Sequence, residues 1–161
     1  MKIPNFINVI SRFLKNTIFF NQEEKETIKP KIQKRRRGTA IVETNQGIII
    51  VSGKSEEFYL LPGGGAEPYE SRRQAAIREL FEETGLKADS AIYLFTHISE
   101  SYQYRDTLSK NCHKVFLIKA NGIPEPRNEI KYIKYYNPGD QTKLSKSTTA
   151  ILEKYLSNKK E

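Results

Sequence analysis

Residues 61–86 combine consecutive glycines with a dense group of carboxylates, and this segment constrains the fold more than any other part of the chain. The three glycines at 63–65 allow backbone conformations closed to other residues and a close approach to a ligand. Ser71 followed three residues later by Gln74 predicts a capping box that begins a helix, and Gly85 predicts the end of that helix. We therefore expect a glycine-rich loop that leads directly into a helix.

The expected helix carries three glutamates on one face. Glu79, Glu82 and Glu83 lie three and four positions apart, so their side chains project from neighbouring positions. Like charges at this spacing repel by about 0.2–0.5 kcal/mol per pair. A hard divalent cation that takes oxygen ligands would turn this repulsion into coordination. On spacing alone, a solvated acidic helix face is the alternative interpretation.

The order of these residues resembles the Nudix box. The matching positions are Gly64, Glu70 after five residues, Arg78-Glu79-Leu80 after seven more, then Glu82-Glu83 and Gly85-Leu86. Because every defined position of the signature is matched, the chain is identified as a member of the Nudix family. The resemblance implies an α/β fold, the Nudix α/β/α sandwich with a mixed β-sheet.

The resemblance also implies a reaction. Nudix enzymes hydrolyse a nucleoside diphosphate linked to another moiety, with Mg²⁺ as the cofactor and Mn²⁺ as an alternative. Water attacks a phosphorus atom of the pyrophosphate, whose negative charge must be screened. By resemblance, Arg78 pairs with a box carboxylate, and Glu70 holds the loop to the helix. The implied metal ligands are Glu79, Glu82, Glu83, Glu67 and the backbone of Gly64.

The general base is left open between several glutamates. Glu79 is either a metal ligand or the base that removes a proton from water. Two downstream residues are the other catalytic candidates: Glu100 at the end of an expected strand, and Glu129 after a pair of prolines. For each of these two, an ordinary surface glutamate is the alternative.

Cationic side chains are concentrated directly before the first strand pattern, with six Lys and Arg between residues 29 and 37. Such a run is usually a solvated edge, but guanidinium groups also suit phosphate oxygens. Together with the glycine segment, this run looks similar to the diphosphoinositol and dinucleoside polyphosphate phosphohydrolases. The substrate-binding residues expected on this basis are Arg35, Arg37, Tyr102 and Tyr104.

The favoured function is therefore a Mg²⁺-dependent pyrophosphohydrolase that acts on a dinucleoside polyphosphate or a similar polyphosphate. One alternative is a sanitising pyrophosphatase for a modified nucleoside triphosphate. Another is a non-catalytic Nudix-fold protein that binds a nucleotide or nucleic acid. The complete set of box carboxylates favours an enzyme.

The net charge of +8 is uneven, because residues 1–38 carry +7 of it. Because the excess charge is not spread over the domain, we do not expect nucleic acid as a partner. The expected partner is a small nucleotide or polyphosphate. Cys112 is the single cysteine, which excludes an intramolecular disulfide and suits a reducing compartment. No apolar run approaches the roughly 20 residues that a membrane-spanning helix needs. We expect a soluble, cytoplasmic protein without a transmembrane segment.

The chain divides into an N-terminal extension, residues 1–30, and a Nudix domain, residues 31–161. Apolar residues at helical spacing predict an amphipathic helix over residues 6–20, followed by a polar linker over residues 21–30. The helix is expected to pack on the domain or on a second subunit, and in the second case the protein would be a homodimer. Contact of the helix with a membrane surface is the alternative.

Alternation and turn residues place the remaining elements. A hairpin is expected to turn at Asn45-Gln46, and a polar loop over residues 101–111 is expected to separate two strands. The expected strands are 38–44, 47–52, 58–61, 91–100, 112–120 and 129–136, and a closing helix is expected over 147–157.

Overall fold

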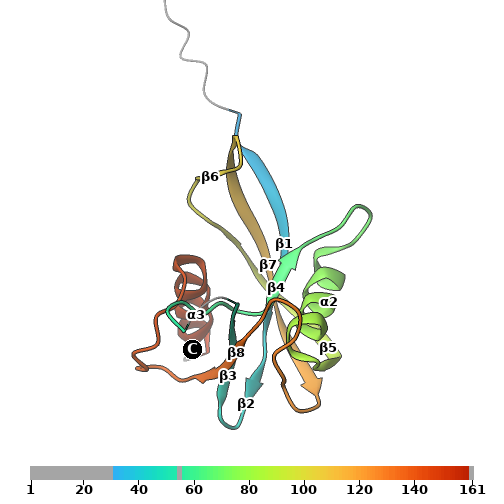
Figure 1. Ribbon diagram of the computed structural model, residues 1–161, viewed down its shortest axis with the longest axis vertical. Coiled ribbons are helices and arrows are strands. Elements are labelled where there is room, and N and C mark those ends of the chain that lie inside the picture. The colour runs from blue at the N-terminus through green and yellow to red at the C-terminus, as the bar shows by residue number, and fades with distance from the viewer. Residues whose placement is uncertain (1–30, 54–55, 160–161) are drawn as a thin grey trace, which may run out of the picture. The chain divides into compact units, whose positions relative to one another are not determined.

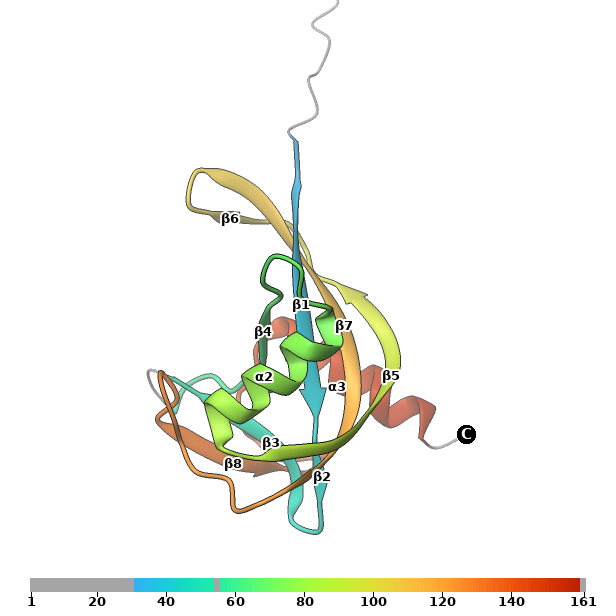
Figure 2. The same ribbon diagram turned by 90° about the vertical axis from the view of Figure 1, so that its right-hand side faces the viewer.

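A mixed β-sheet with one helix on each face forms the framework of the protein (Figures 1 and 2). The structure is a computed structural model that describes residues 31–53 and 56–159. Its elements are β1 (Gln33–Ile41), β2 (Glu43–Thr44), β3 (Gly47–Ser52), β4 (Gly63–Gly65), α2 (Arg72–Thr84), β5 (Lys87–Ile98), β6 (Tyr102–Tyr104), β7 (Thr107–Asn121), β8 (Tyr132–Tyr136) and α3 (Lys146–Asn158). The expected extension, residues 1–30, lies outside the described residues.

The larger sheet has the strand order β4-β1-β7-β5, with β6 paired to β7, and the smaller sheet has the order β2-β3-β8. β1 runs parallel to β7, and the other strand pairs are antiparallel. Pairing of Arg37 with His113 sets the register between the two parallel strands. The predicted α/β/α sandwich with a mixed sheet is confirmed. Within the described residues, no helix is long and apolar enough to span a bilayer.

Alternate residues of the central strands pack against the two helices. Ala40 contributes to the core below α2, whereas its neighbour Ile41 contributes to the core below α3. Val115 and Phe116 of β7 divide in the same way. Because side chains alternate across a strand, one hydrophobic run supplies both cores, and the even and odd positions of β1 face different helices.

The predicted ends of α2 are confirmed. The Ser71 hydroxyl accepts a hydrogen bond from the Gln74 backbone N–H, and the Gln74 side chain accepts one from the Ser71 backbone N–H. Gly85 ends the helix in the left-handed conformation, with φ at 73°. These local signals fix where the glutamate-bearing helix begins and ends.

The predicted polar loop over residues 101–111 is wrong, because this segment forms β6 and the first part of β7. The two strands meet at a turn where Arg105 has φ at 51°. Polar side chains are tolerated there because Ser109 alone of these residues is buried, so composition did not reveal the hairpin. The predicted strand over residues 58–61 is also wrong. It reduces to isolated bridges, Val51 to Leu60 and Tyr59 to Leu144.

The basic run was expected directly before the first strand, but its last four residues, 34–37, are part of β1, which begins at Gln33. Its cations therefore alternate between the two faces of the sheet. In Figure 1, β6 and the adjoining ends of β1 and β7 extend beyond the rest of the sheet. We call this segment, Gln33–Arg37 with residues 102–111, the arm.

Gly38 brings α2 against β1, and we predict that Gly38→Ala lowers the free energy of unfolding by about 1–3 kcal/mol. A Cβ at this position would overlap the Arg72 carbonyl oxygen and lie 2.5 Å from the Ala76 backbone nitrogen. Gly65→Ala is the matched control, because a Cβ there meets nothing within 4 Å. Urea unfolding of both variants measures the difference, and equal stabilities would contradict this packing.

Candidate active site

The glutamate face of α2 lies directly against the glycine strand β4. A Cβ on Gly64 would overlap the Glu79 carboxylate, so the absence of a side chain is what lets that carboxylate lie on the strand. The Gly63 backbone N–H donates a hydrogen bond to Glu83 Oε2 at 3.0 Å. The glycines and the glutamates therefore form one unit, in which the strand edge positions the carboxylates.

Arg78 ties the helix to the glycine loop. Its guanidinium donates two hydrogen bonds to the Glu70 carboxylate, at 3.0 and 3.1 Å, and one to the Gly65 carbonyl at 3.0 Å. The same group also bonds Glu79 Oε1 at 3.0 Å and Glu82 Oε2 at 2.9 Å. The bond with Arg78 lowers the pKa of Glu70, and the bond with Glu70 raises the pKa of Arg78. Arg78 is placed to orient two box carboxylates.

Glu83 is a buried carboxylate with only 7% of its surface exposed. Burial raises its pKa to about 8, and the charges of Glu79 and Glu129 act in the same direction. The Gly63 N–H and the Arg37 charge oppose the shift only in part. Burial also raises the pKa of Glu79, against the effect of Arg78. For both carboxyls, the cost of burying the charge therefore exceeds the stabilisation that the neighbouring cations and N–H groups provide.

Each of the three glutamates of α2 keeps one oxygen without a hydrogen-bond partner among the described residues. These oxygens are Glu79 Oε2, Glu82 Oε1 and Glu83 Oε1, because Arg78 and Gly63 use the other oxygen of each. In this arrangement, no three Asp, Glu, His or Cys side chains of residues 31–53 and 56–159 form a ready metal-binding group. Metal coordination thus requires these carboxylates to turn their free oxygens toward one point.

Glu67, the remaining carboxylate of the expected metal set, is exposed in the loop between β4 and α2. Its backbone N–H donates to Glu70 Oε2 at 2.9 Å, and the Glu70 N–H donates back to the Glu67 carbonyl. The structure therefore places Glu67 on the loop that Arg78 holds, with its carboxylate in solvent.

The expected substrate-binding residues divide into two places. Half-buried Arg37 donates to the Gly63 carbonyl at 3.0 Å and lies near Glu79 and Glu83, whose charges oppose the lowering of its pKa by burial. Arg35 instead lies on the arm, where it bonds the Tyr102 hydroxyl at 3.0 Å and packs 3.8 Å from the centre of the Tyr104 ring. Arg37 alone of the four predicted residues joins the carboxylates.

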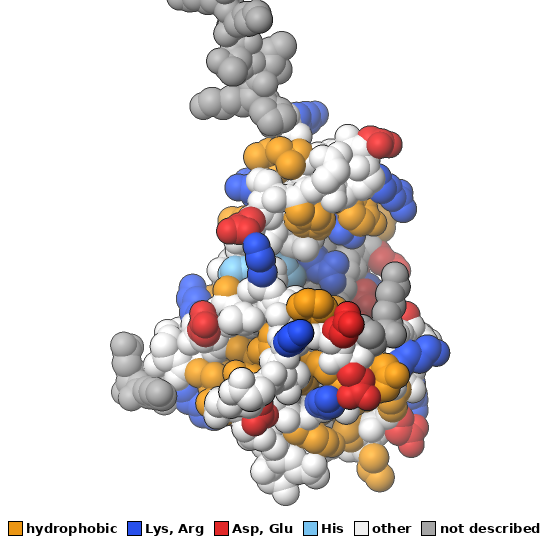
Figure 3. All heavy atoms as spheres, turned by 60° about the vertical axis from the view of Figure 1, so that its left-hand side comes forward, with side chains coloured by type: hydrophobic (Ala, Val, Ile, Leu, Met, Phe, Trp, Pro, Cys, Tyr) orange, Lys and Arg blue, Asp and Glu red, His pale blue; other side chains and the backbone are white. Residues whose placement is uncertain are grey.

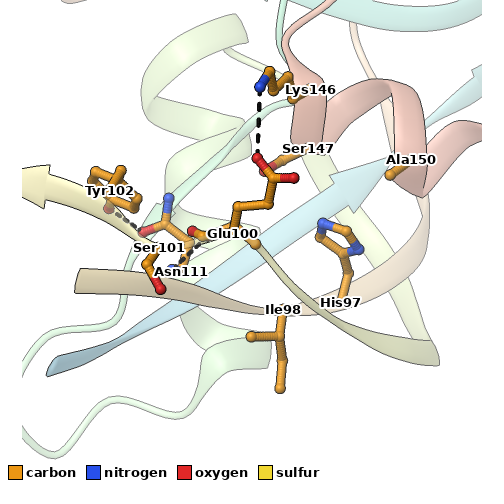
Figure 4. Close-up of a pocket in the computed structure, with 10 residues that line it drawn as sticks. His97, Ile98, Glu100, Ser101, Tyr102, Asn111, Lys146, Ser147 and Ala150 are labelled. Atoms are coloured by element: carbon orange, nitrogen blue, oxygen red, sulfur yellow. Dashed lines mark hydrogen bonds and ion pairs between the residues drawn. The ribbon is translucent and has the colours of Figure 1, made fainter. Parts of the chain in front are cut away.

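The two downstream base candidates lie in different surroundings. Glu129 is in a turn close enough to Glu83 for its charge to raise the pKa of that carboxyl. Backbone N–H groups of the same loop, from Glu125 and Arg127, donate to the last carbonyls of α2. Glu100 is exposed and points toward Lys146 of α3, with 3.5 Å between the charged atoms (Figure 4).

Two cavities adjoin this site on the α3 side of the sheet. One, of about 360 Å³, reaches from Gly63 and Arg37 to the first turn of α3. The second, of about 530 Å³, lies beside the arm and shares Asn111, Lys146 and Ser147 with the first. Figure 3 shows histidine side chains next to cationic ones on the surface below the arm.

Sequence reasoning missed Thr39 and Asn111, two polar residues of the sheet that line these cavities together with His113. His113 Nδ1 lies 2.8 Å from the Thr39 hydroxyl, and its Nε2 has no partner among the described residues. Burial lowers the pKa of His113 to about 4, assisted by Arg37 and His97, so the ring is neutral at pH 7. Because side chains alternate along β1, the sequence could have placed Thr39 on the same face as Arg37. It could not have shown that β7 is the neighbouring strand, whose register brings His113 beside them.

Comparisons with known proteins agree with the resemblance to the Nudix family. Residues 34–155 match the family model described as NUDIX domain. A structure of a proposed nudix hydrolase family member from Chromobacterium violaceum is 37% identical, with a TM-score of 0.67 and 83% of each chain covered.

Two curated relatives match over short segments. A proposed 8-oxo-dGTP diphosphatase of Bacillus subtilis is 42% identical over 48 residues, which is 30% of this chain and 32% of that protein. The diphosphoinositol polyphosphate phosphohydrolase 3-beta of Bos taurus is 42% identical over 40 residues, or 25% of this chain and 24% of that protein. The chain thus aligns with a third or less of the length of these relatives.

The burial of Glu83 predicts a pH-dependent penalty in metal-free protein. Its pKa of about 8 in the folded protein lies above the ordinary 4.5. The free energy of unfolding is therefore highest below pH 4.5, where Glu83 is protonated in both states, and it falls as the pH rises through 8. In EDTA, the free energy of unfolding of wild type should fall relative to Glu83→Gln by about 2–4 kcal/mol over this range.

Urea unfolding at a series of pH values checks this expectation. Glu153→Gln on the exposed side of α3 is the control and should follow the wild-type pH curve. Parallel curves for wild type and Glu83→Gln would show that Glu83 titrates normally.

Proposed function

The chain belongs to the NUDIX domain family, and on this premise we propose that it is a Mg²⁺-dependent pyrophosphohydrolase acting on a nucleoside diphosphate linked to another moiety. One observation carries the proposal. Three carboxylates of α2 each keep a free oxygen at the edge of β4, beside the cation Arg37 and the opening of a cavity.

The donor set fits a hard divalent cation. Mg²⁺ prefers oxygen ligands, and a cation would stabilise the ionised forms of Glu79 and Glu83, whose pKa values are raised by burial. Glu79, Glu82 and Glu83 would hold it, with Glu67 and the Gly64 backbone as further ligands. Mn²⁺ suits the same oxygens. When bound, such an ion screens pyrophosphate oxygens and lowers the pKa of a coordinated water.

Arg37 supports the same chemistry from the protein side. One of its N–H groups is bound to the Gly63 carbonyl, and the rest of the guanidinium lies in the wall of the 360 Å³ cavity. A guanidinium has five N–H donors, so Arg37 can bind phosphate oxygens without leaving the strand edge. Its position beside the carboxylates would hold the scissile pyrophosphate at the metal ligands.

We assign the general base to Glu129 ahead of Glu100. Glu129 shares the electrostatic environment of Glu83, whereas Glu100 pairs with Lys146 beside the second cavity. A base must lie within hydrogen-bond reach of the water that attacks phosphorus, so proximity to the carboxylates favours Glu129. Glu79 stays the alternative within α2.

The positions of the two cavities favour two classes of substrate. A modified nucleoside triphosphate would place its nucleoside in the cavity next to Arg37. A dinucleoside polyphosphate is the second candidate, because the adjoining 530 Å³ cavity offers room for a second nucleoside. The cations of the basic run do not all face these cavities, because Arg36 lies on the other face of the sheet and donates to the Glu70 carbonyl at 2.9 Å. The run therefore cannot bind a long polyphosphate with all of its arginines.

Hydrolysis by purified protein tests the proposal. With Mg²⁺, we expect turnover of at least one member of a panel of ADP-ribose, dinucleoside polyphosphates, sugar nucleotides and modified triphosphates. Glu83→Gln should lower kcat by at least about 10²-fold, because it removes charge that holds the metal. Glu129→Gln should lower kcat by about 10²–10⁴-fold through loss of the base.

Glu153→Gln, an exposed change on α3, should keep wild-type kcat and serves as the control. A large loss in Glu100→Gln together with an active Glu129→Gln would transfer the base to Glu100. Nucleotide binding without turnover of any panel member would support the non-catalytic alternative.

A further inference from the structure

A hydrogen-bond relay on the arm fixes the orientation of Asn111. Arg35 donates to the Tyr102 hydroxyl oxygen at 3.0 Å, and that hydroxyl lies 2.7 Å from Asn111 Oδ1. Because arginine can only donate, the tyrosine proton is free to go to the amide oxygen. The Asn111 amide nitrogen is then turned away from Tyr102 and has no hydrogen bond within residues 31–53 and 56–159.

A second, shorter relay fixes the tautomer of His113. The Thr39 hydroxyl contacts one hydrogen-bond partner among the described residues, His113 Nδ1. Since a buried hydroxyl proton needs an acceptor, Nδ1 accepts it and Nε2 carries the ring proton. The histidine is 8% exposed, and its Nε2 is buried without a partner in the described part of the chain.

The first relay therefore ends on an uncharged amide donor in the walls of the cavities, whereas His113 Nε2 is buried behind the wall. Asn111 lines both cavities, and His113 lines the one next to Arg37. Strand alternation and the parallel register place these residues on the same face of the sheet as Thr39, toward α3. Figure 4 shows Asn111 between Tyr102 and the first turn of α3.

Donors without partners call for acceptors on the ligand. A carbonyl oxygen of a nucleobase would satisfy an N–H group, whereas an exocyclic amino group in the same position would leave two donors facing each other. A bound base would cover the Asn111 amide, and a buried donor left unsatisfied in this way costs about 1–3 kcal/mol. The walls thus discriminate by polarity between bases of equal size.

We propose that these cavities select nucleobases with a carbonyl group, such as hypoxanthine, guanine or uracil, over bases with an amino group at the same place. Asn111 is the specificity-determining residue, and Tyr102 and Arg35 are positioning residues. The inference rests on the proposed function, which places the nucleoside in the cavity beside Arg37.

Matched pairs of nucleoside monophosphates test the selection by binding alone. IMP and AMP differ by a carbonyl against an amino group at one ring edge, and UMP and CMP differ in the same way. Calorimetry with Mg²⁺ should give at least roughly tenfold tighter binding of the carbonyl member of each pair. Equal affinities, preference for the amino member, or no binding of either nucleotide at millimolar concentration would overturn the proposal.

Variants locate the selection in the relays. Asn111→Asp replaces the amide donor by an acceptor, so the ratio of IMP to AMP affinity should fall severalfold or reverse. Tyr102→Phe frees the amide to rotate and should lower the same ratio at least about threefold. Tyr93→Phe is the control, because it removes a hydroxyl 3.0 Å from Thr96 on exposed β5.

An unchanged ratio in both Asn111→Asp and Tyr102→Phe would overturn the assignment of these residues. The binding ratio also separates the inference from the proposed catalysis. If the protein hydrolyses nucleotides but shows no base preference, the base-selection proposal is wrong and the catalytic proposal stands. If it shows a base preference but no turnover, the catalytic proposal is wrong and base selection stands.

Discussion

The approach of α2 to the glycine edge of the larger sheet is the contact on which the rest of the site depends. Gly38 lets the helix backbone touch β1, and Gly64 leaves room for the Glu79 carboxylate. The Gly63 N–H then fixes Glu83 at the same edge. Any side chain at these glycines would separate the carboxylates from the strand that positions them.

This contact is electrostatically unfavourable for the protein alone. Burying Glu83 and Glu79 raises the pKa of each, and the neighbouring cations reduce the shifts without cancelling them. Arg78 bonds three carboxylates but leaves an oxygen of both Glu79 and Glu82 free. Buried carboxylates that lower the stability of the protein are expected at sites where their charge binds a ligand.

Local features of the site could be predicted from the sequence, because they depend on spacing within one helix. The ends of α2 at Ser71 and Gly85 and the common face of its glutamates follow from helix geometry. The cavity walls could not be predicted in this way. They require the parallel pairing of β1 with β7, which brings Thr39 and His113 together across 74 positions of sequence.

The same limitation explains the misassigned arm. Its tyrosines and cations gave residues 101–111 the composition of a loop, but β7 pairs with both β6 and β1 and makes the segment part of the sheet. Arg35 is consequently bound to Tyr102, and Tyr102 is bound to Asn111. Their chemistry was visible in the sequence, but their partners were not.

We propose that the α2 carboxylates hold a divalent cation at the edge of β4. Titration of Mn²⁺ followed by electron paramagnetic resonance measures this binding, because protein-bound Mn²⁺ loses the sharp signal of the free ion. Wild type should bind Mn²⁺, Mg²⁺ should displace it, and a Glu82→Gln, Glu83→Gln double variant should lose this binding. Equal Mn²⁺ binding by wild type and a folded double variant would show that these carboxylates do not hold the cation.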